Sequence, residues 1–251
     1  MSENLVSIVI RTYNEERWVG VALRSIELQQ TDFEIEVVLV DSGSTDKTVE
    51  RATECFPNLV KCSVDFFRPG SALNVGVNNA SGKYIIFLSA HCVPADEIWL
   101  DTLIKPLIDE KIVACYGRQI PLKNSTDLDK RDLWVTFGIE DRIQKIEPFF
   151  HNANSAVRKD YVIKNPFDES LKNLEDRVWA SEQLAKGGTI KYVSSAVVFH
   201  QHGIHQNADL SRARGVCNVM ESLHASDPYY TKYEFPFSRM QKCLIFPVSC
   251  D

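Results

Sequence analysis

The chain has 251 residues, of which 44% are hydrophobic and 25% charged, and its formal net charge at pH 7 is -6. These proportions are typical of a globular protein with a large core, and the acidic excess argues against nucleic acid as a partner. Seven cysteines occur without a C-x-x-C pair, which argues against a zinc ribbon or a disulfide scaffold and indicates reduced, cytoplasmic thiols. No segment approaches the roughly 20 apolar residues that span a bilayer, so we expect a cytoplasmic protein that is at most peripheral to a membrane.

Short apolar runs alternate with amphipathic stretches through the first 117 residues. The expected strands are Leu5–Ile10, Ile35–Val40, Val60–Phe66, Tyr84–Leu88 and Ile112–Tyr116, and the expected helices are Arg17–Gln29, Gly70–Ala80 and one that follows Asp96. Strands that are apolar throughout are buried on both faces, and their alternation with helices implies right-handed crossovers. We therefore predict an α/β fold with a mainly parallel central sheet and helices on both faces.

The alternation weakens after Gly117. The polar segment Pro121–Asp132 is predicted to be a loop, and the later expected elements are the strands Phe149–Val157 and Ile190–His200 and the helices Leu174–Lys186 and Leu210–Ala225. These assignments rest on apolar spacing interrupted by polar residues. They predict that the second half of the chain mixes helices and strands less regularly than the first.

Polar residues follow the first two predicted strands directly. Thr12, Asn14 and Glu15 come after the first strand, and Asp41 comes after the second. In open α/β sheets the carboxyl ends of the strands form the ligand-binding edge. Asp41 either accepts hydrogen bonds from a ribose or base, or only forms an Asx turn with the residues after it. The dinucleotide fingerprint G-x-G-x-x-G is absent, so binding through that motif is not expected.

Four ordered segments in the first 100 or so residues carry a family resemblance. They are Ser7–Glu16, Val38–Asp46, Arg68–Gly82 and the strand that ends at Ser89-Ala90-His91. The first three resemble the signatures of family 2 glycosyltransferases, which are inverting enzymes with the Rossmann-like GT-A fold. Further along, Glu175-Asp176 resembles the acidic pair that opens a helix near the acceptor in this family. The resemblance implies a nucleotide-sugar donor.

The resemblance also implies roles for individual residues. Thr12, Asn14, Glu15 and Asp41 would hold the base and ribose of the donor, with Arg68 close by and with Ser89 and His91 at the diphosphate. Asp176, with Glu175 beside it, would be the general base that deprotonates the acceptor hydroxyl. The alternative is that the two acids only form the first turn of a helix, where carboxylates favour the helix dipole.

The sequence departs from the family at Ser89-Ala90-His91, where members usually have Asp-x-Asp to hold a divalent cation. The expected cofactor is therefore either a divalent cation such as Mn²⁺ or Mg²⁺, or none. Magnesium prefers carboxylates, whereas imidazole suits Zn²⁺, Ni²⁺ or Co²⁺ better. Three hypotheses stay open. His91 binds a metal with His200 or His202; His91 and cations such as Arg212 or Arg214 neutralise the diphosphate without a metal; or the chemistry has been lost.

The other histidines are assigned from their positions in the predicted strands and loops. His200 and His202 would point to opposite faces if the strand continued, so only one of them is expected to enter the cleft. His151, His205 and His224 are expected to be lone surface histidines.

The resemblance suggests one domain over residues 1–225, with a nucleotide-binding half (1–117) and an α+β acceptor half (118–225). Residues 226–251 form an extension that mixes aromatic and basic side chains. Such a segment can contact the inner membrane peripherally, pack on the domain, or join a homodimer. Packing is favoured because the extension has no clear amphipathic period.

These inferences predict an inverting transferase that moves one sugar from a nucleotide-sugar donor to a hydroxyl of a glycan or glycolipid. The expected setting is bacterial surface polysaccharide or glycolipid synthesis. The processive motif Q-x-x-R-W is absent, which favours transfer of a single sugar. The alternatives are a catalytically silent nucleotide-sugar-binding or scaffold protein, suggested by the missing Asp-x-Asp, and a sugar nucleotidyltransferase.

Overall fold

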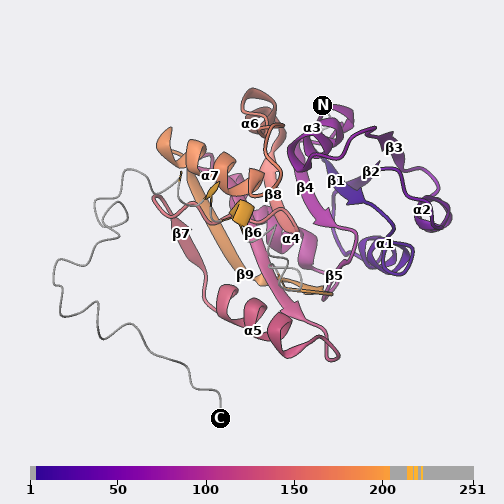
Figure 1. The fold of residues 1–251 in the computed structure, drawn as a ribbon. Helices are drawn as coiled ribbons and strands as arrows, with labels where there is room; N and C mark the ends of the chain where they lie inside the picture. The colour runs from indigo at the N-terminus through magenta and orange to yellow at the C-terminus, as the bar shows by residue number, and fades with distance from the viewer. Residues whose placement is uncertain (1–3, 204–213, 217, 220–221, 223–251) are drawn as a thin grey trace, which may run out of the picture.

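The computed structural model describes residues 4–203, 214–216, 218, 219 and 222, and within them a nine-stranded sheet carries helices on both faces (Figure 1). The strands are β1 (Leu5–Thr12), β2 (Glu34–Asp41), β3 (Val60–Ser63), β4 (Tyr84–Ser89), β5 (Cys92–Pro94), β6 (Ile112–Pro121), β7 (Arg142–Gln144), β8 (Asn154–Arg158) and β9 (Thr189–His200). The helices are α1 (Val19–Glu27), α2 (Thr48–Cys55), α3 (Pro69–Asn79), α4 (Trp99–Ile104), the 3₁₀ helix η1 (Lys105–Ile108), α5 (Asp127–Thr136), α6 (Lys159–Lys164) and α7 (Glu175–Ala185).

The first half of the sheet has the order β3-β2-β1-β4, and all of these strands are parallel. Alternate residues of β1 enter two separate cores: Ile8 and Ile10 pack with α1, whereas Val9 packs with α3 on the other face. This two-sided burial explains why β1 is apolar at successive positions. Gly76 lets α3 lie close to the sheet, because a Cβ at that position would come within 2.3 Å of Val9 Cγ1.

The second half extends the same sheet with strands of mixed direction. β8 runs antiparallel between β4 and β6, and β6 is parallel to β9. β5 and β7 are both antiparallel to β9. The mainly parallel first half and the less regular second half therefore agree with the sequence-based expectation of an α/β fold.

Several predicted boundaries were wrong. The segment Pro121–Asp132 is not a loop throughout, because α5 begins at Asp127 and the Thr126 hydroxyl accepts a hydrogen bond from the Asp129 backbone N–H at 3.2 Å. This N-cap, with acids in the first turn, stabilises a helix that has little apolar periodicity. β3 ends at Ser63 rather than Phe66, and β8 begins at Asn154 rather than Phe149.

The end of the chain is described only in part. Within the expected helix Leu210–Ala225, residues 214–216, 218, 219 and 222 are helical. The extension 226–251, Arg212, His205 and His224 lie outside the described residues. In the part of the chain that the structure describes, no helix combines the length and the apolar character needed to cross a bilayer.

Candidate active site

A cleft of about 380 Å³ opens at the carboxyl ends of β1 and β4. Polar side chains from both halves of the sequence line it, namely Arg11, Thr12, Glu15, Ser89, His91, His151, Asn152, Glu175, Asp176, Arg177, His200 and His202. Register explains the meeting of the first-half residues, because Thr12 pairs with Asp41 and Arg11 pairs with Ser89 across neighbouring parallel strands. The cleft is therefore at the edge where α/β sheets bind ligands.

Four of the seven predicted donor-binding residues line the cleft: Thr12, Glu15, Ser89 and His91. Asp41 lies beside Thr12, whose hydroxyl donates to Asp41 Oδ1 at 3.0 Å. The other oxygen, Asp41 Oδ2, accepts from the backbone N–H groups of Gly43 and Ser44 at 3.0 and 2.9 Å. Asp41 thus forms the Asx turn that was one of its two predicted roles.

Asn14 and Arg68 also lie outside the described lining of the cleft. Asn14 has φ 55° and its side-chain oxygen accepts from the Thr45 N–H at 2.9 Å, which ties the first loop to the second. Arg68 precedes α3, and its guanidinium lies 4.9 Å from the ring centre of Phe66. These residues therefore shape the loops around the cleft.

Glu175 and Asp176 begin α7 and are both buried, with 5% and 7% of their surface exposed. Arg11 Nη1 donates to Glu175 Oε1 at 3.2 Å. Asp176 Oδ2 accepts from the Asn152 N–H at 3.1 Å, and Asp176 Oδ1 accepts from the Arg177 N–H at 2.8 Å. These bonds fix the Asp176 carboxylate, so the pair is more than an acidic first turn facing solvent.

Two unusual backbone conformations precede carboxylates of the cleft. Leu174, directly before Glu175, has φ 58°, and Asn14, directly before Glu15, has φ 55°. Asparagine tolerates this left-handed region, whereas leucine does so only under strain. Such strain is concentrated at functional sites, where the surrounding structure holds a residue in place.

Burial changes the protonation of the acidic pair. Loss of hydration raises the pKa of Glu175 to about 7, with a further rise from the neighbouring Asp176 charge and an opposing effect of Arg11. Burial also raises the pKa of Asp176, against hydrogen bonds from Asn152 and Arg177. The pair therefore exchanges a proton at a higher pH than ordinary carboxylates do.

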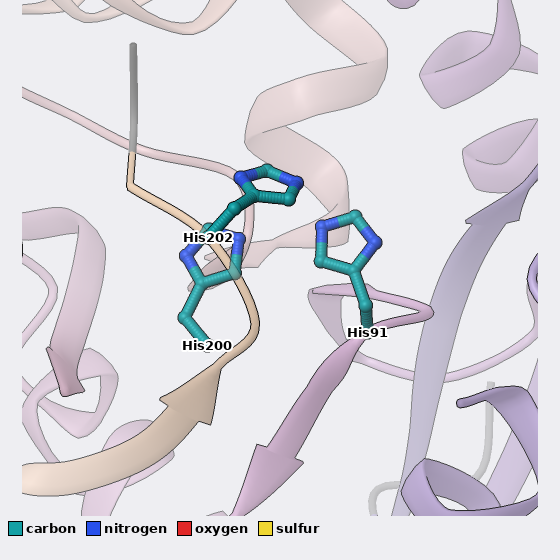
Figure 2. Close-up of side chains that lie close together, drawn as sticks. All are labelled: His91, His200 and His202. Carbon is teal, nitrogen blue, oxygen red and sulfur yellow. The ribbon is translucent and has the colours of Figure 1, made fainter. Parts of the chain in front are cut away.

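His91, His200 and His202 form a compact cluster in the same cleft (Figure 2). Their ring centres are 4.6 to 5.1 Å apart, and one ring nitrogen from each lies within 4.8 Å of those from the other two. β5 brings them together, because Cys92 pairs with His200 across the β5–β9 ladder. The expectation that only one of His200 and His202 enters the cleft was wrong: β9 ends at His200, so strand alternation does not apply to His202.

The Nδ1 atom of each clustered histidine faces an oxygen. His91 Nδ1 lies 2.6 Å from Glu15 Oε1, His200 Nδ1 lies 2.8 Å from Gln119 Oε1, and His202 Nδ1 lies 2.8 Å from the Gly203 carbonyl oxygen. A carboxylate, an amide oxygen and a carbonyl accept hydrogen bonds, so each Nδ1 carries the hydrogen and donates it. The lone pair of each neutral ring is then on Nε2.

Burial has the opposite effect on the histidines. It lowers the pKa of His200 well below its usual value, and the nearby His91, His202 and His151 lower it further. The pKa of His202 is lowered as well, first by burial and then by His91. These two rings are therefore neutral near pH 7.

Sequence reasoning missed the places of two residues around this cluster. Glu15 was assigned to the base and ribose, and the sequence did not indicate that its carboxylate also contacts His91. His151 was expected at the surface, but it lines the cleft, and the Gln119 amide nitrogen lies 2.9 Å from its Nδ1. The pairing Pro121↔His200 brings Gln119, two residues earlier in β6, to the end of β9, and this pairing has no local sequence signal.

Arg214, one of two cations proposed to neutralise the diphosphate, is exposed. The same described part of the chain does reach the cleft, because Val216 lines it. A Cβ on Gly215 would meet the Asn173 side-chain nitrogen at 2.7 Å, so this segment lies against the loop before α7.

Comparison with known proteins gives a family. The protein-family model described as glycosyl transferase family 2 matches residues 7–165, which is well over half of the chain. The chain belongs to this family. The enzyme class and the GT-A fold predicted from the motifs are confirmed, and the match ends before the Glu175-Asp176 pair.

Curated relatives and solved structures agree with this membership. This glycosyltransferase is 27% identical to the O-antigen chain rhamnosyltransferase RfbN of Salmonella typhimurium, over 82% of this chain and 69% of that protein. It is 28% identical to a UDP-Glc:alpha-D-GlcNAc-diphosphoundecaprenol beta-1,3-glucosyltransferase of Escherichia coli, over 52% of this chain and 51% of that protein. The mannosyltransferase PcManGT of Pyrobaculum calidifontis, solved with GDP-Man and Mn2+, superposes with a TM-score of 0.66 at 21% identity, over 88% of this chain and 63% of that chain. The chain thus spans about half to two thirds of the length of these proteins.

Proposed function

We propose that this glycosyltransferase moves one sugar from a nucleotide sugar to an acceptor hydroxyl with inversion, and that Asp176 is the general base. The observation that carries the proposal is the placement of a buried, hydrogen-bonded carboxylate pair in the same cleft as the strand-end residues Thr12 and Ser89. A carboxylate with a raised pKa, held by two backbone N–H groups, suits proton abstraction near neutral pH.

The donor is proposed to lie across the strand ends of residues 1–117. Its base and ribose would contact Thr12, Asn14, Glu15 and Asp41, with Arg68 nearby. Its diphosphate would lie beside Ser89 and His91. Thr12 and Ser89 end the neighbouring strands β1 and β4, which supports one continuous binding surface. The acceptor would approach from residues 118–225, where Asp176 lies. A divalent cation bound at the diphosphate would neutralise the charge that develops on the leaving group.

The proposed reaction is a single displacement. Asp176 takes the proton of the acceptor hydroxyl while its oxygen forms a bond to the anomeric carbon of the donor sugar. The bond from that carbon to the diphosphate oxygen breaks, and the nucleoside diphosphate leaves with the electron pair. Glu175 either carries a negative charge or shares a proton with Asp176, and Arg11 holds it in place. We propose that Glu175 positions Asp176 and tunes its pKa.

The relatives suggest the biological setting. One relative is named for the O-antigen chain and another for a diphosphoundecaprenol-linked sugar. We therefore propose a role in bacterial surface polysaccharide or glycolipid synthesis. A glycolipid acceptor would require work at the cytoplasmic side of the inner membrane, with peripheral contact or a homodimer made through residues 226–251.

The test measures release of nucleoside diphosphate from a panel of UDP-, GDP- and dTDP-linked sugars, with lipid-linked and soluble glycan acceptors. The wild-type protein should turn over one donor class, and Asp176→Asn should abolish turnover while the same donor still raises the melting temperature. Glu182→Gln, which changes an exposed carboxylate on the same helix, is the matched control and should retain activity.

Two outcomes would overturn the proposal. Full activity of Asp176→Asn would show that another group is the base. Donor-dependent stabilisation of the wild-type protein without turnover on any acceptor would instead favour the silent nucleotide-sugar-binding protein.

A further inference from the structure

We propose that His91, His200 and His202 bind one Zn²⁺ ion through their Nε2 atoms, in place of the carboxylate-held cation that Asp-x-Asp provides. The inference deepens the proposed function, because it names the metal at the diphosphate, but the site itself is argued from geometry alone. The following observations on the three side chains carry it.

The first observation is convergence. One nitrogen from each ring lies within 4.8 Å of the others, and Figure 2 shows ring nitrogens of His91 and His202 directed toward each other, with His200 beside them. Zn–N bonds of about 2.0–2.1 Å in a tetrahedron place two nitrogens roughly 3.3 Å apart. The three nitrogens would therefore approach one another by up to about 1.5 Å on binding one ion.

The second observation is that the Nδ1 atom of each ring is hydrogen-bonded to an oxygen. Histidines that bind a metal through one nitrogen donate the other N–H to a carboxylate, carbonyl or similar acceptor, which fixes the tautomer. Here Glu15, Gln119 and the Gly203 carbonyl provide that acceptor for His91, His200 and His202 respectively. Three independent contacts from three segments of the chain thus direct all three Nε2 lone pairs away from their acceptors.

The third observation is an unsatisfied buried atom. His200 is only 2% exposed, and its Nε2 has no hydrogen-bond partner among the described residues. A buried polar atom without a partner destabilises the folded state, so such atoms usually have a bound water, ion or ligand. A metal ion between the three rings would satisfy this nitrogen directly.

The ligand type selects the metal. Three neutral imidazoles suit Zn²⁺, Co²⁺ or Ni²⁺, whereas Mg²⁺ requires oxygen ligands and retains water. Three protein ligands leave the fourth position of a tetrahedral zinc open. The cluster lines the cleft, so the open position faces the space where the diphosphate would lie.

The experiment uses the untagged full chain with metal as the probe and no sugar donor. Protein stripped with EDTA is equilibrated with equimolar Zn²⁺, Mn²⁺ and Mg²⁺, and bound metal is measured by mass spectrometry. One Zn²⁺ per chain is expected, and the Co²⁺-loaded protein should show the visible absorption of a tetrahedral site. His91→Ala and His202→Ala should each weaken Zn²⁺ binding by more than about tenfold.

Lys172→Gln is the matched control, because Lys172 lines the same cleft but does not belong to the cluster. It should retain the ion. The inference is overturned if the wild-type protein keeps no more zinc than His91→Ala, if it prefers Mg²⁺, or if Lys172→Gln loses the ion as completely as His91→Ala does. Circular dichroism of each variant shows whether it has folded. Since no donor is present, a failed metal test leaves glycosyl transfer open, and an inactive enzyme leaves the metal site open.

Discussion

The cleft holds two polar groups, the Glu175–Asp176 pair, called the carboxylate end, and the His91–His200–His202 cluster, called the histidine end. Their hydrogen bonds are satisfied in different ways. At the carboxylate end, oxygens of Glu175 and Asp176 receive hydrogen bonds from Arg11 and from backbone N–H groups. At the histidine end, one nitrogen of each ring is bound from behind and the other is directed toward its neighbours. The first arrangement suits a group that exchanges a proton, and the second suits groups that present lone pairs to a metal.

Burial also shifts the pKa values of the two ends in opposite directions. It raises the pKa of Glu175 and Asp176 and lowers the pKa of His200 and His202. In both cases burial disfavours the charged form. The same low-dielectric cleft therefore keeps a proton on one end near neutral pH and removes it from the other.

Asp176→Asn should separate the two ends with the largest effect. Loss of a general base typically costs about 10²–10⁴ in turnover. The amide keeps the shape and one acceptor oxygen, so donor-induced stabilisation and zinc content should remain at the wild-type level. Steady-state kinetics and metal analysis on one preparation measure both quantities. A parallel loss of zinc would mean that the two ends are structurally coupled.

Glu15→Gln should affect the histidine end alone. Removing the carboxylate that holds His91 should weaken Zn²⁺ binding by about 10–100-fold, as is usual for groups that orient a metal ligand. Competition with a chromophoric chelator measures this affinity. Glu16→Gln is the control, because the Glu16 side chain accepts from the Lys47 N–H instead. Equal weakening by both changes would contradict the specific role of Glu15.

Arg11→Gln should shift the pH dependence of turnover. The base must be deprotonated, so activity falls as the pH drops through the raised pKa of the acidic pair, near 7 for Glu175. Arg11 lowers this pKa, and its removal should move the acid limb of the profile upward by about one unit. The measurement is kcat between pH 5 and about 9, with Arg24→Gln on α1 as a control. An unshifted limb would show that the Arg11–Glu175 pair does not tune the base.

The sequence was sufficient for the parts of the site that lie close together in the chain. Apolar runs predicted the parallel strands, and the residues after them, such as Thr12 and Ser89, do line the cleft. The contacts of His91 with Glu15 and His200 were not predictable in the same way. They join residues 76 and more than 100 positions apart and depend on the β5–β9 pairing, which three residues of β5 determine.

Glu175→Gln should also change the stability of the protein, and this is the smallest effect that we expect. Folding raises the pKa of Glu175 from 4.5 to about 7. Between these two pH values, Glu175 is therefore protonated in the folded protein and ionised in the unfolded chain. This contribution favours the folded state at low pH and is lost as the pH rises through that window. Glutamine has no such dependence. The melting temperature of Glu175→Gln relative to wild type should therefore rise across the window, by roughly 2–4 °C for each kcal/mol of this contribution, which is about 1.4 kcal/mol per pKa unit. Scanning calorimetry at several pH values tests this, and Glu182→Gln should give a flat difference. A flat difference for Glu175→Gln as well would mean that the carboxylate end is not held at a raised pKa, which would remove the contrast with the histidine end.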